Sequence, residues 1–165
     1  MTDKNLPLIA RGLYWQELRL GALGRTFRRT VTESDLVNFI SVTGMLEAIF
    51  IDAEYPDAAI PGRVVPAALT QGFIEGMLFQ TIIQGTGLAL LEIATKAHGP
   101  VRVGDSVWAT INTLEVKPTS KHDRAIVTSD VKVFNQRDEL VLGYVVKRLM
   151  AGRPEITADD GLRAV

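Results

Sequence analysis

Apolar residues recur at helical spacing in the first third of the chain. Thr32 and Asp35 stand three apart, as in a capping box, and apolar positions then repeat every three or four residues up to Gly44. This pattern predicts a short helix of about Glu33 to Val42. The next stretch, residues 45–62, contains two prolines and has no stable period, so we expect an ordered loop there.

A longer helix is predicted from Pro66 to Ile83. A proline at its start and apolar residues on most sides are typical of a helix that is buried along its length. Ala68, Gly72 and Gly76 stand four apart and form a stripe of small residues on one face. Such a stripe lets another backbone or a ligand approach closely, and we favour close packing as its explanation.

Beyond residue 87 the pattern changes to strand-like runs separated by turn-forming residues. The last run is apolar on both faces from Leu140 to Val146, which favours a place in the sheet interior. An earlier strand is expected within residues 24–32. The four later runs are LALLEIATKA (88–97), DSVWATINTLEV (105–116), RAIVTSDVKVFN (124–135) and ELVLGYVVKRLM (139–150). This order of elements predicts an α+β fold, with a mainly antiparallel sheet packed against the long helix.

Composition narrows the class of protein. A length of 165 residues with 47% hydrophobic and 22% charged residues predicts one domain, with a core of about residues 8–153 and a polar C-terminal tail. The 18 basic residues against 19 acidic ones argue against a nucleic-acid partner. No apolar run reaches the length of a membrane span, and the start does not resemble a secretory signal, so we expect a cytoplasmic protein.

The absence of cysteine excludes thiolate chemistry, and two histidines, His98 and His122, cannot make a three-histidine site by themselves. We therefore predict no metal and no cofactor.

Four segments match the motifs of one known family in order and spacing. They are GMLEAIFID (44–52), RVVPAALT (63–70), PVRVGDSV (100–107) and NQRDELV (135–141). With these segments the chain resembles the MaoC-like dehydratase and (R)-specific enoyl-CoA hydratase family of the hotdog fold. The resemblance implies a single hotdog domain in which a curved antiparallel sheet wraps a long central helix.

The resemblance also indicates where chemistry would occur. The family's catalytic aspartate and histidine fall here on Met45 and Phe50, and neither side chain exchanges a proton near neutral pH. In the family the thioester carbonyl accepts hydrogen bonds from backbone N–H groups at the start of the central helix. The family's glycine at that point falls on Ala67. The resemblance therefore implies binding of an acyl-CoA thioester without the usual acid/base pair.

Glu47 is the carboxylate nearest the altered motif and is our candidate catalytic residue. Apolar neighbours such as Met45 and Phe50 would raise its pKa and suit it to acid/base work. The alternative is a loop carboxylate that pairs with an arginine such as Arg63. Arg63 could itself meet an acidic group of coenzyme A or form a surface salt bridge. The candidate substrate-binding residues are Met45, Phe50, Arg63, Val65, Pro66 and Ala67.

The predicted function is that of an acyl-CoA hydratase/dehydratase family protein that binds an acyl-CoA thioester, with altered or lost hydratase activity. Two alternatives remain: a noncatalytic hotdog subunit or acyl-CoA binding module, and a thioesterase that uses Glu47 or Glu75. For Glu75 we favour a subunit contact or solvent exposure over catalysis. A lone hotdog exposes a sheet edge and part of its helix, so we expect a homodimer or a higher homo-oligomer and no membrane contact.

Overall fold

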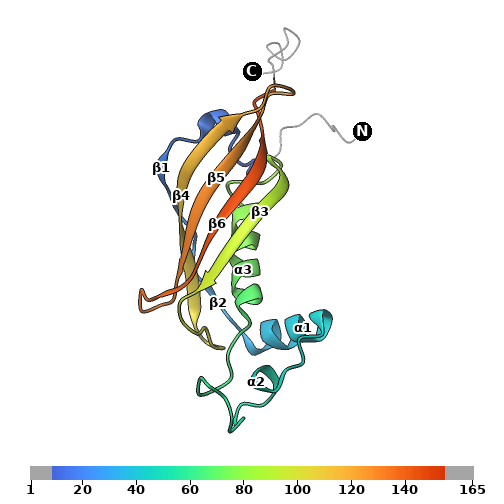
Figure 1. Cartoon of the computed structure of the whole chain (residues 1–165), viewed down its shortest axis with the longest axis vertical. Helices are drawn as coiled ribbons and strands as arrows, with labels where there is room; N and C mark the ends of the chain where they lie inside the picture. The colour runs from blue at the N-terminus through green and yellow to red at the C-terminus, as the bar shows by residue number, and fades with distance from the viewer. Residues whose placement is uncertain (1–8, 155–165) are drawn as a thin grey trace.

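A computed structural model describes residues 9–154 and shows an antiparallel sheet along one long helix (Figure 1). The strand order is β1-β4-β5-β6-β3, and the short β2 pairs with β4 outside this path. The strands are β1 (Gly21–Arg25), β2 (Arg29–Thr30), β3 (Gly87–Ala97), β4 (Ser106–Pro118), β5 (Arg124–Phe134) and β6 (Leu140–Ala151). The α+β class predicted from the sequence is confirmed.

The central strands show alternating buried and exposed residues. In β5, Val131 and Val133 are fully buried while Lys132 between them is exposed, because successive side chains point to opposite faces of a sheet. Strand β6 lies between β5 and β3, so its predicted interior position is confirmed. Val131 of β5 pairs with the buried Tyr144 of β6.

Helix α1 (Glu33–Thr43) begins with the predicted capping box. The Thr32 hydroxyl accepts a hydrogen bond from the Asp35 amide at 3.2 Å, and the Thr32 amide donates to the Asp35 carboxylate at 2.9 Å. The helix ends at Gly44, whose φ of 72° places it in the left-handed region that favours glycine. Both ends therefore depend on interactions within the segment itself.

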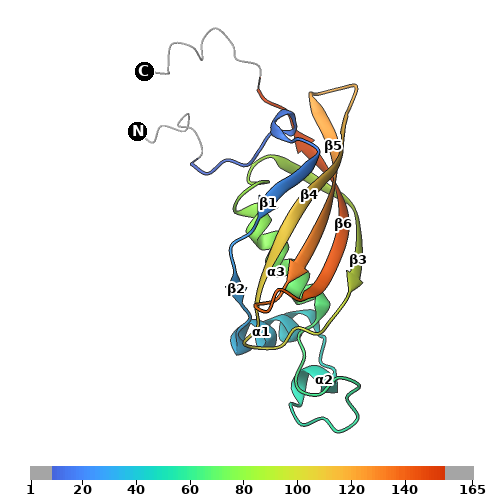
Figure 2. The ribbon, with the colours of Figure 1, turned by 90° about the vertical axis from the view of Figure 1, so that its left-hand side faces the viewer.

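The long helix α3 (Ala67–Phe79) lies along the inner face of the curved sheet (Figure 2). It ends four residues before the predicted Ile83. The Thr81 hydroxyl donates to the Met77 carbonyl at 2.8 Å, and the Ile83 amide donates to the Leu78 carbonyl, five residues back. These bonds replace the helical pattern and turn the chain toward β3. The buried side chains of α3 are Leu69, Thr70, Phe73, Ile74, Met77 and Leu78.

Two predicted segments are more finely divided than expected. The strand expected within residues 24–32 is broken between β1 and β2. There the Thr26 amide donates to the Ala109 carbonyl, and the Thr26 hydroxyl accepts from the Ala109 amide. The loop expected at residues 45–62 contains one helical turn, α2 (Ala48–Ile51). Helices α1 and α2 lie together at one end of the molecule, beyond the sheet (Figure 1).

A short 3₁₀ helix, η1 (Trp15–Glu17), precedes β1 and contacts the C-terminal end of the described chain. The Arg153 amide donates to the Gln16 side chain at 3.1 Å, and the Arg153 guanidinium pairs with Glu17 at 3.3 Å. Most of the predicted polar tail lies outside the described residues. None of the helices within residues 9–154 is long and apolar enough to cross a membrane.

Candidate functional site

A cavity of about 460 Å³ opens at the N-terminal end of α3. It lies between the α2 segment, the start of α3, the β3–β4 connection and the beginning of β6, and its lining is mostly apolar. The lining residues are Ile49, Phe50, Ile60, Val64, Val65, Pro66, Ala67, Thr70, Ala97, His98, Gly99, Pro100, Val101, Val141 and Leu142. Segments that are far apart in the sequence therefore meet at this cavity.

The chain enters α3 along the edge of this cavity. The amide of the buried Val65 donates to the Val101 carbonyl at 2.8 Å, which fixes the approach against the β3–β4 connection. Pro66 follows in an extended conformation, with φ −53° and ψ 134°, and caps the helix. The helix start is therefore held from the sheet side.

The first turn of α3 leaves the amide of Ala67, a residue of the cavity wall, without an acceptor in the helix. The Leu69 and Thr70 amides both donate to the Pro66 carbonyl, at 3.0 and 3.2 Å. The Ala67 amide precedes these bonded amides, at a position where an α-helix provides no acceptor of its own. Because the N-terminal end of a helix carries a partial positive charge, this end of the cavity suits an electron-rich oxygen.

Thr70 is the functional candidate that the sequence analysis missed. Thr70 is among the residues that line the cavity but is only 1% exposed, and its buried hydroxyl oxygen has no hydrogen-bond partner among the described residues. The only available signal was its spacing, three residues after Ala67 on the same helical face. Spacing alone cannot show that a hydroxyl lacks a partner.

Arg63 joins the two small helices beneath the cavity. Its Nε donates to the Phe50 carbonyl at 2.5 Å, and its guanidinium forms an ion pair with Glu33 at the start of α1. The salt-bridge alternative for Arg63 is therefore the one observed. Its partner is Glu33, so the pairing with Glu47 that we considered is not formed.

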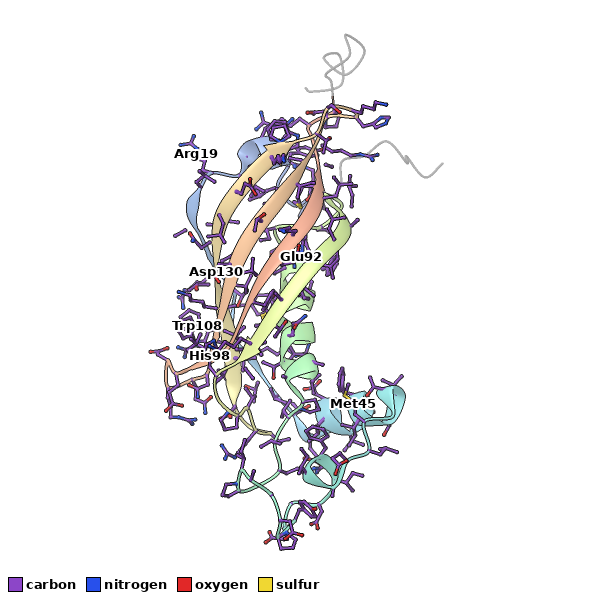
Figure 3. All side chains as sticks on the ribbon, in the orientation of Figure 1. Arg19, Met45, Glu92, His98, Trp108 and Asp130 are labelled. Carbon is purple, nitrogen blue, oxygen red and sulfur yellow. The ribbon has the colours of Figure 1, made fainter. Side chains whose placement is uncertain are left out.

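The structure separates Met45 and Glu47 from the cavity lining. Glu47 is the exposed N-cap residue of α2, and Met45 is 40% exposed at the turn between α1 and α2 (Figure 3). Neither lines the cavity. Of the predicted binding residues, the structure brings together Phe50, Val65, Pro66 and Ala67.

His98 lies at the end of β3, at the lower end of the sheet in Figure 3. A Cβ added to Gly143 would lie 3.4 Å from its Nε2. The neighbours of Gly143 along β6, Leu142 and Tyr144, are buried on the inner face, so Gly143 faces outward. The imidazole therefore lies on the same side of β6 as Gly143, and His98 is also one of the residues that line the cavity.

The carboxylate of Glu75 has two partners on β6. Its carboxylate accepts a hydrogen bond from the Tyr144 hydroxyl at 2.7 Å and pairs with the guanidinium of the buried Arg148. Burial first, and then the Glu75 charge, hold the pKa of Tyr144 well above its usual value. The solvent exposure that we favoured for Glu75 is wrong, because this network ties α3 to β6 inside the core.

Within residues 9–154 no group of three histidine, aspartate or glutamate side chains is arranged to hold a metal ion. The cavity brings together an apolar lining, the N-terminal end of α3, the buried Thr70 and the ring-bearing His98.

Comparison with known proteins identifies the fold. The chain is 28% identical to 3-hydroxybutyryl-CoA dehydratase of Methylorubrum extorquens over 133 residues, 80% of each chain. It is 26% identical to (R)-specific enoyl-CoA hydratase of Rhodospirillum rubrum, over 66% of this chain and 74% of that protein. The MaoC-like dehydratase structure from Rhodospirillum rubrum superposes with a TM-score of 0.78 at 23% identity, covering 87% of this chain and 99% of that one.

No family model matches the chain. The relatives and structural neighbours are nevertheless MaoC-like dehydratases and (R)-hydratases, and the chain has their hotdog fold. The resemblance and the fold predicted from the sequence are confirmed.

Proposed function

We propose that this protein binds an acyl-CoA thioester, with the acyl group in the cavity and the thioester carbonyl oxygen at the Ala67 amide. The observation that carries the proposal is the position of the α3 N-terminus at the wall of an apolar cavity. A thioester presents the two features that this arrangement suits: an apolar chain and a carbonyl oxygen with partial negative charge. The cavity volume of about 460 Å³ lies within the range of small-molecule sites.

Binding, rather than the addition or removal of water, is the main activity that we propose. Hydration of an enoyl thioester needs a side chain that can give and take a proton near the third acyl carbon. The family positions for that task are Met45 and Phe50, and Glu47 is exposed outside the cavity lining. The chain therefore resembles a hydratase that retains the ligand site and lacks the acid/base pair.

A second candidate is hydratase or dehydratase turnover through Glu47. It is favoured by the position of Glu47 at the start of α2, whose Ile49 and Phe50 belong to the cavity wall, and by the activities named for the relatives. Thioester hydrolysis through Glu75 is disfavoured, because Tyr144 and Arg148 already occupy its carboxylate.

The enoyl absorbance of crotonyl-CoA and the release of free thiol distinguish these functions. Binding without a change in either signal supports the acyl-CoA binding protein. Turnover that falls by about a hundredfold or more in Glu47→Gln, at unchanged affinity, would establish the second candidate instead. Thiol release that is unchanged in Glu47→Gln would contradict both of these functions and would indicate a thioesterase.

Removal of one backbone donor tests the site itself. Ala67→Pro deletes the amide proton at the first helical position, where proline is well tolerated. We expect the affinity for butyryl-CoA, measured by calorimetry, to fall about tenfold through loss of one hydrogen bond. Ala48→Pro makes the same change at the first position of α2, outside the cavity lining, and should leave the affinity unchanged. Equal affinities in both variants would contradict the proposed carbonyl site.

The proposal includes a homodimer as the functional unit. Strand β3 is an edge strand of 11 residues with three exposed leucines, Leu88, Leu90 and Leu91. Beside it, a Cβ built on Gly72 or Gly76 of α3 would meet no atom within 4 Å. The packing partner that we expected for this stripe is therefore absent from the described part of the chain. A second copy, paired through β3 and the stripe, would cover both surfaces.

A further inference from the structure

We infer that Arg25 and Arg28 form a binding site for a phosphate monoester on the outer face of the sheet, separate from the cavity. The guanidiniums of both residues lie over one indole ring, that of Trp108 near the start of β4 (Figure 3). This site goes beyond the proposed function, because it does not require an acyl-CoA ligand.

Trp108 lies on the outer face of the sheet. Its neighbours along β4, Val107 and Ala109, are fully buried on the inner face, and successive side chains of a strand point to opposite faces. Helix α3 lies along the inner face and contributes to the cavity wall (Figure 2). The indole ring and the start of α3 are therefore on opposite sides of the sheet, and Trp108 does not line the cavity.

The indole ring is held in place by two contacts. Its Nε1 donates to the Asn135 carbonyl at 3.2 Å, and the Phe134 ring stacks on it from β5, with the ring centroids 5.0 Å apart. Strand β4 lies between β1 and β5, so Phe134 and the two arginines reach the ring from opposite sides of β4. A ring fixed in this way orders the arginine side chains that stack on it.

The two guanidiniums converge on this ring. The guanidinium carbon of Arg25 lies 5.8 Å from the ring centroid, and that of Arg28 lies 6.0 Å from it. The segment that carries both residues is tied to β4, because the Thr26 amide donates to the Ala109 carbonyl at 2.8 Å and the Thr26 hydroxyl accepts from the Ala109 amide at 2.9 Å. Uncharged groups therefore hold two positive charges near one point.

The positive charge is only partly balanced within residues 9–154. Arg25 has no ion pair there. Arg28 has one, with Asp138 at 3.8 Å, and the two side chains are 52% and 71% exposed. An ion pair with that exposure contributes little. A further anion between the two guanidiniums would supply the missing negative charge.

A phosphate monoester fits this pair better than a carboxylate does. It carries about two negative charges at pH 7 and has three acceptor oxygens, so it can accept hydrogen bonds from two planar guanidiniums at once. One guanidinium already satisfies both oxygens of a carboxylate. The ligand class that we assign to the site is therefore a small phosphorylated molecule.

Substitutions at exposed positions separate this site from a general effect of charge. Arg25→Gln and Arg28→Gln each remove one guanidinium, and Arg25→Lys keeps the charge but loses the planar fork. Asp138→Asn removes the carboxylate that competes for Arg28. Arg19→Gln is the matched control, because Arg19 is an exposed arginine just before β1 that does not stack on Trp108 in the described chain.

Inorganic phosphate is the probe, and the fluorescence of Trp108 reports its binding. The titration uses the full chain with Trp15→Phe, which removes the only other tryptophan. We expect a saturable change in emission. The phosphate affinity should fall about tenfold in Arg25→Gln and in Arg28→Gln, and less in Arg25→Lys. It should rise in Asp138→Asn and stay unchanged in Arg19→Gln.

Three outcomes would overturn the inference. The first is no saturable change in emission, and the second is an equal loss of affinity in Arg19→Gln and Arg25→Gln. The third is competition between phosphate and butyryl-CoA, which would assign the two arginines to the nucleotide end of coenzyme A instead of a separate ligand. Acyl-CoA binding is measured by calorimetry without phosphate, so failure of this site leaves the proposed function standing.

Discussion

At the scale of single residues, the pairing of Glu75 with Arg148 has the largest expected effect on stability. Arg148 is 8% exposed, and Glu75 is the acidic residue with which it forms an ion pair. Removing one partner of a buried pair leaves the other charge desolvated and uncompensated, which costs about 3–5 kcal/mol. Loss of the Tyr144 hydroxyl removes one hydrogen bond and leaves the ion pair in place.

We therefore expect Glu75→Gln to lower the free energy of unfolding by about 3–5 kcal/mol and Tyr144→Phe by about 1 kcal/mol, as measured by urea denaturation. Glu92→Gln breaks an exposed ion pair with Lys147 at 2.6 Å and should change stability little. Similar small losses in all three variants would show that water reaches Glu75 and screens its charge.

At the scale of elements, the capping box makes the start of α1 sensitive to acid. Burial alone would raise the pKa of Asp35, but hydrogen bonds from the Thr32 hydroxyl and amide, together with the Arg29 charge, outweigh it and lower that pKa below 3.8. Because the folded-state pKa is the lower one, the stabilisation is complete above about pH 4 and is lost as the pH falls through the folded-state value.

Asp35→Asn should therefore lower the melting temperature at pH 7 by about 2–4 °C, as expected for the loss of about 1 kcal/mol in a chain of this size. The difference between the variant and the unmodified protein should shrink as the pH is lowered below 4. Glu54→Gln, at an exposed carboxylate of the loop, should leave the melting temperature unchanged. A difference that stayed constant down to pH 2.5 would exclude the charge of Asp35 as its cause.

At the scale of the whole molecule, the exposed edge of β3 predicts assembly. Gln71 of α3 accepts a hydrogen bond from the Thr95 hydroxyl of β3 at 2.7 Å, which holds the helix beside this edge. Pairing of two β3 strands would bury the edge leucines and provide partners for the unpaired backbone groups.

Light scattering should therefore give twice the chain mass of 18.1 kDa. Leu90→Lys places a charge in the proposed interface and should shift the protein toward 18.1 kDa. Leu114→Lys makes the same change at an exposed leucine of β4, which is not an edge strand, and should leave the dimer intact. A monomer at micromolar concentration without any substitution would contradict the dimer proposal.

The features that the sequence by itself determined depend on neighbours along the chain. The capping box of Thr32 and Asp35 lies within three residues, and the alternation in β5 follows from the geometry of every strand. Both were predictable, as were the class and the family resemblance. The end of α3 was not predictable from the sequence. The hydrogen bond from the Thr81 hydroxyl to the Met77 carbonyl competes with continuation of the helix, and the pattern of apolar residues does not reveal such a bond.

Only the tertiary structure decided which polar groups meet. It paired Arg63 with Glu33 and Glu75 with Arg148, across 30 and 73 residues of sequence, and left the hydroxyl of Thr70 without a partner in the cavity wall. The charge and hydrogen-bonding capacity of a side chain are properties of its residue type. Whether they are satisfied depends on chain segments that only the packing of helix against sheet brings within about 3 Å.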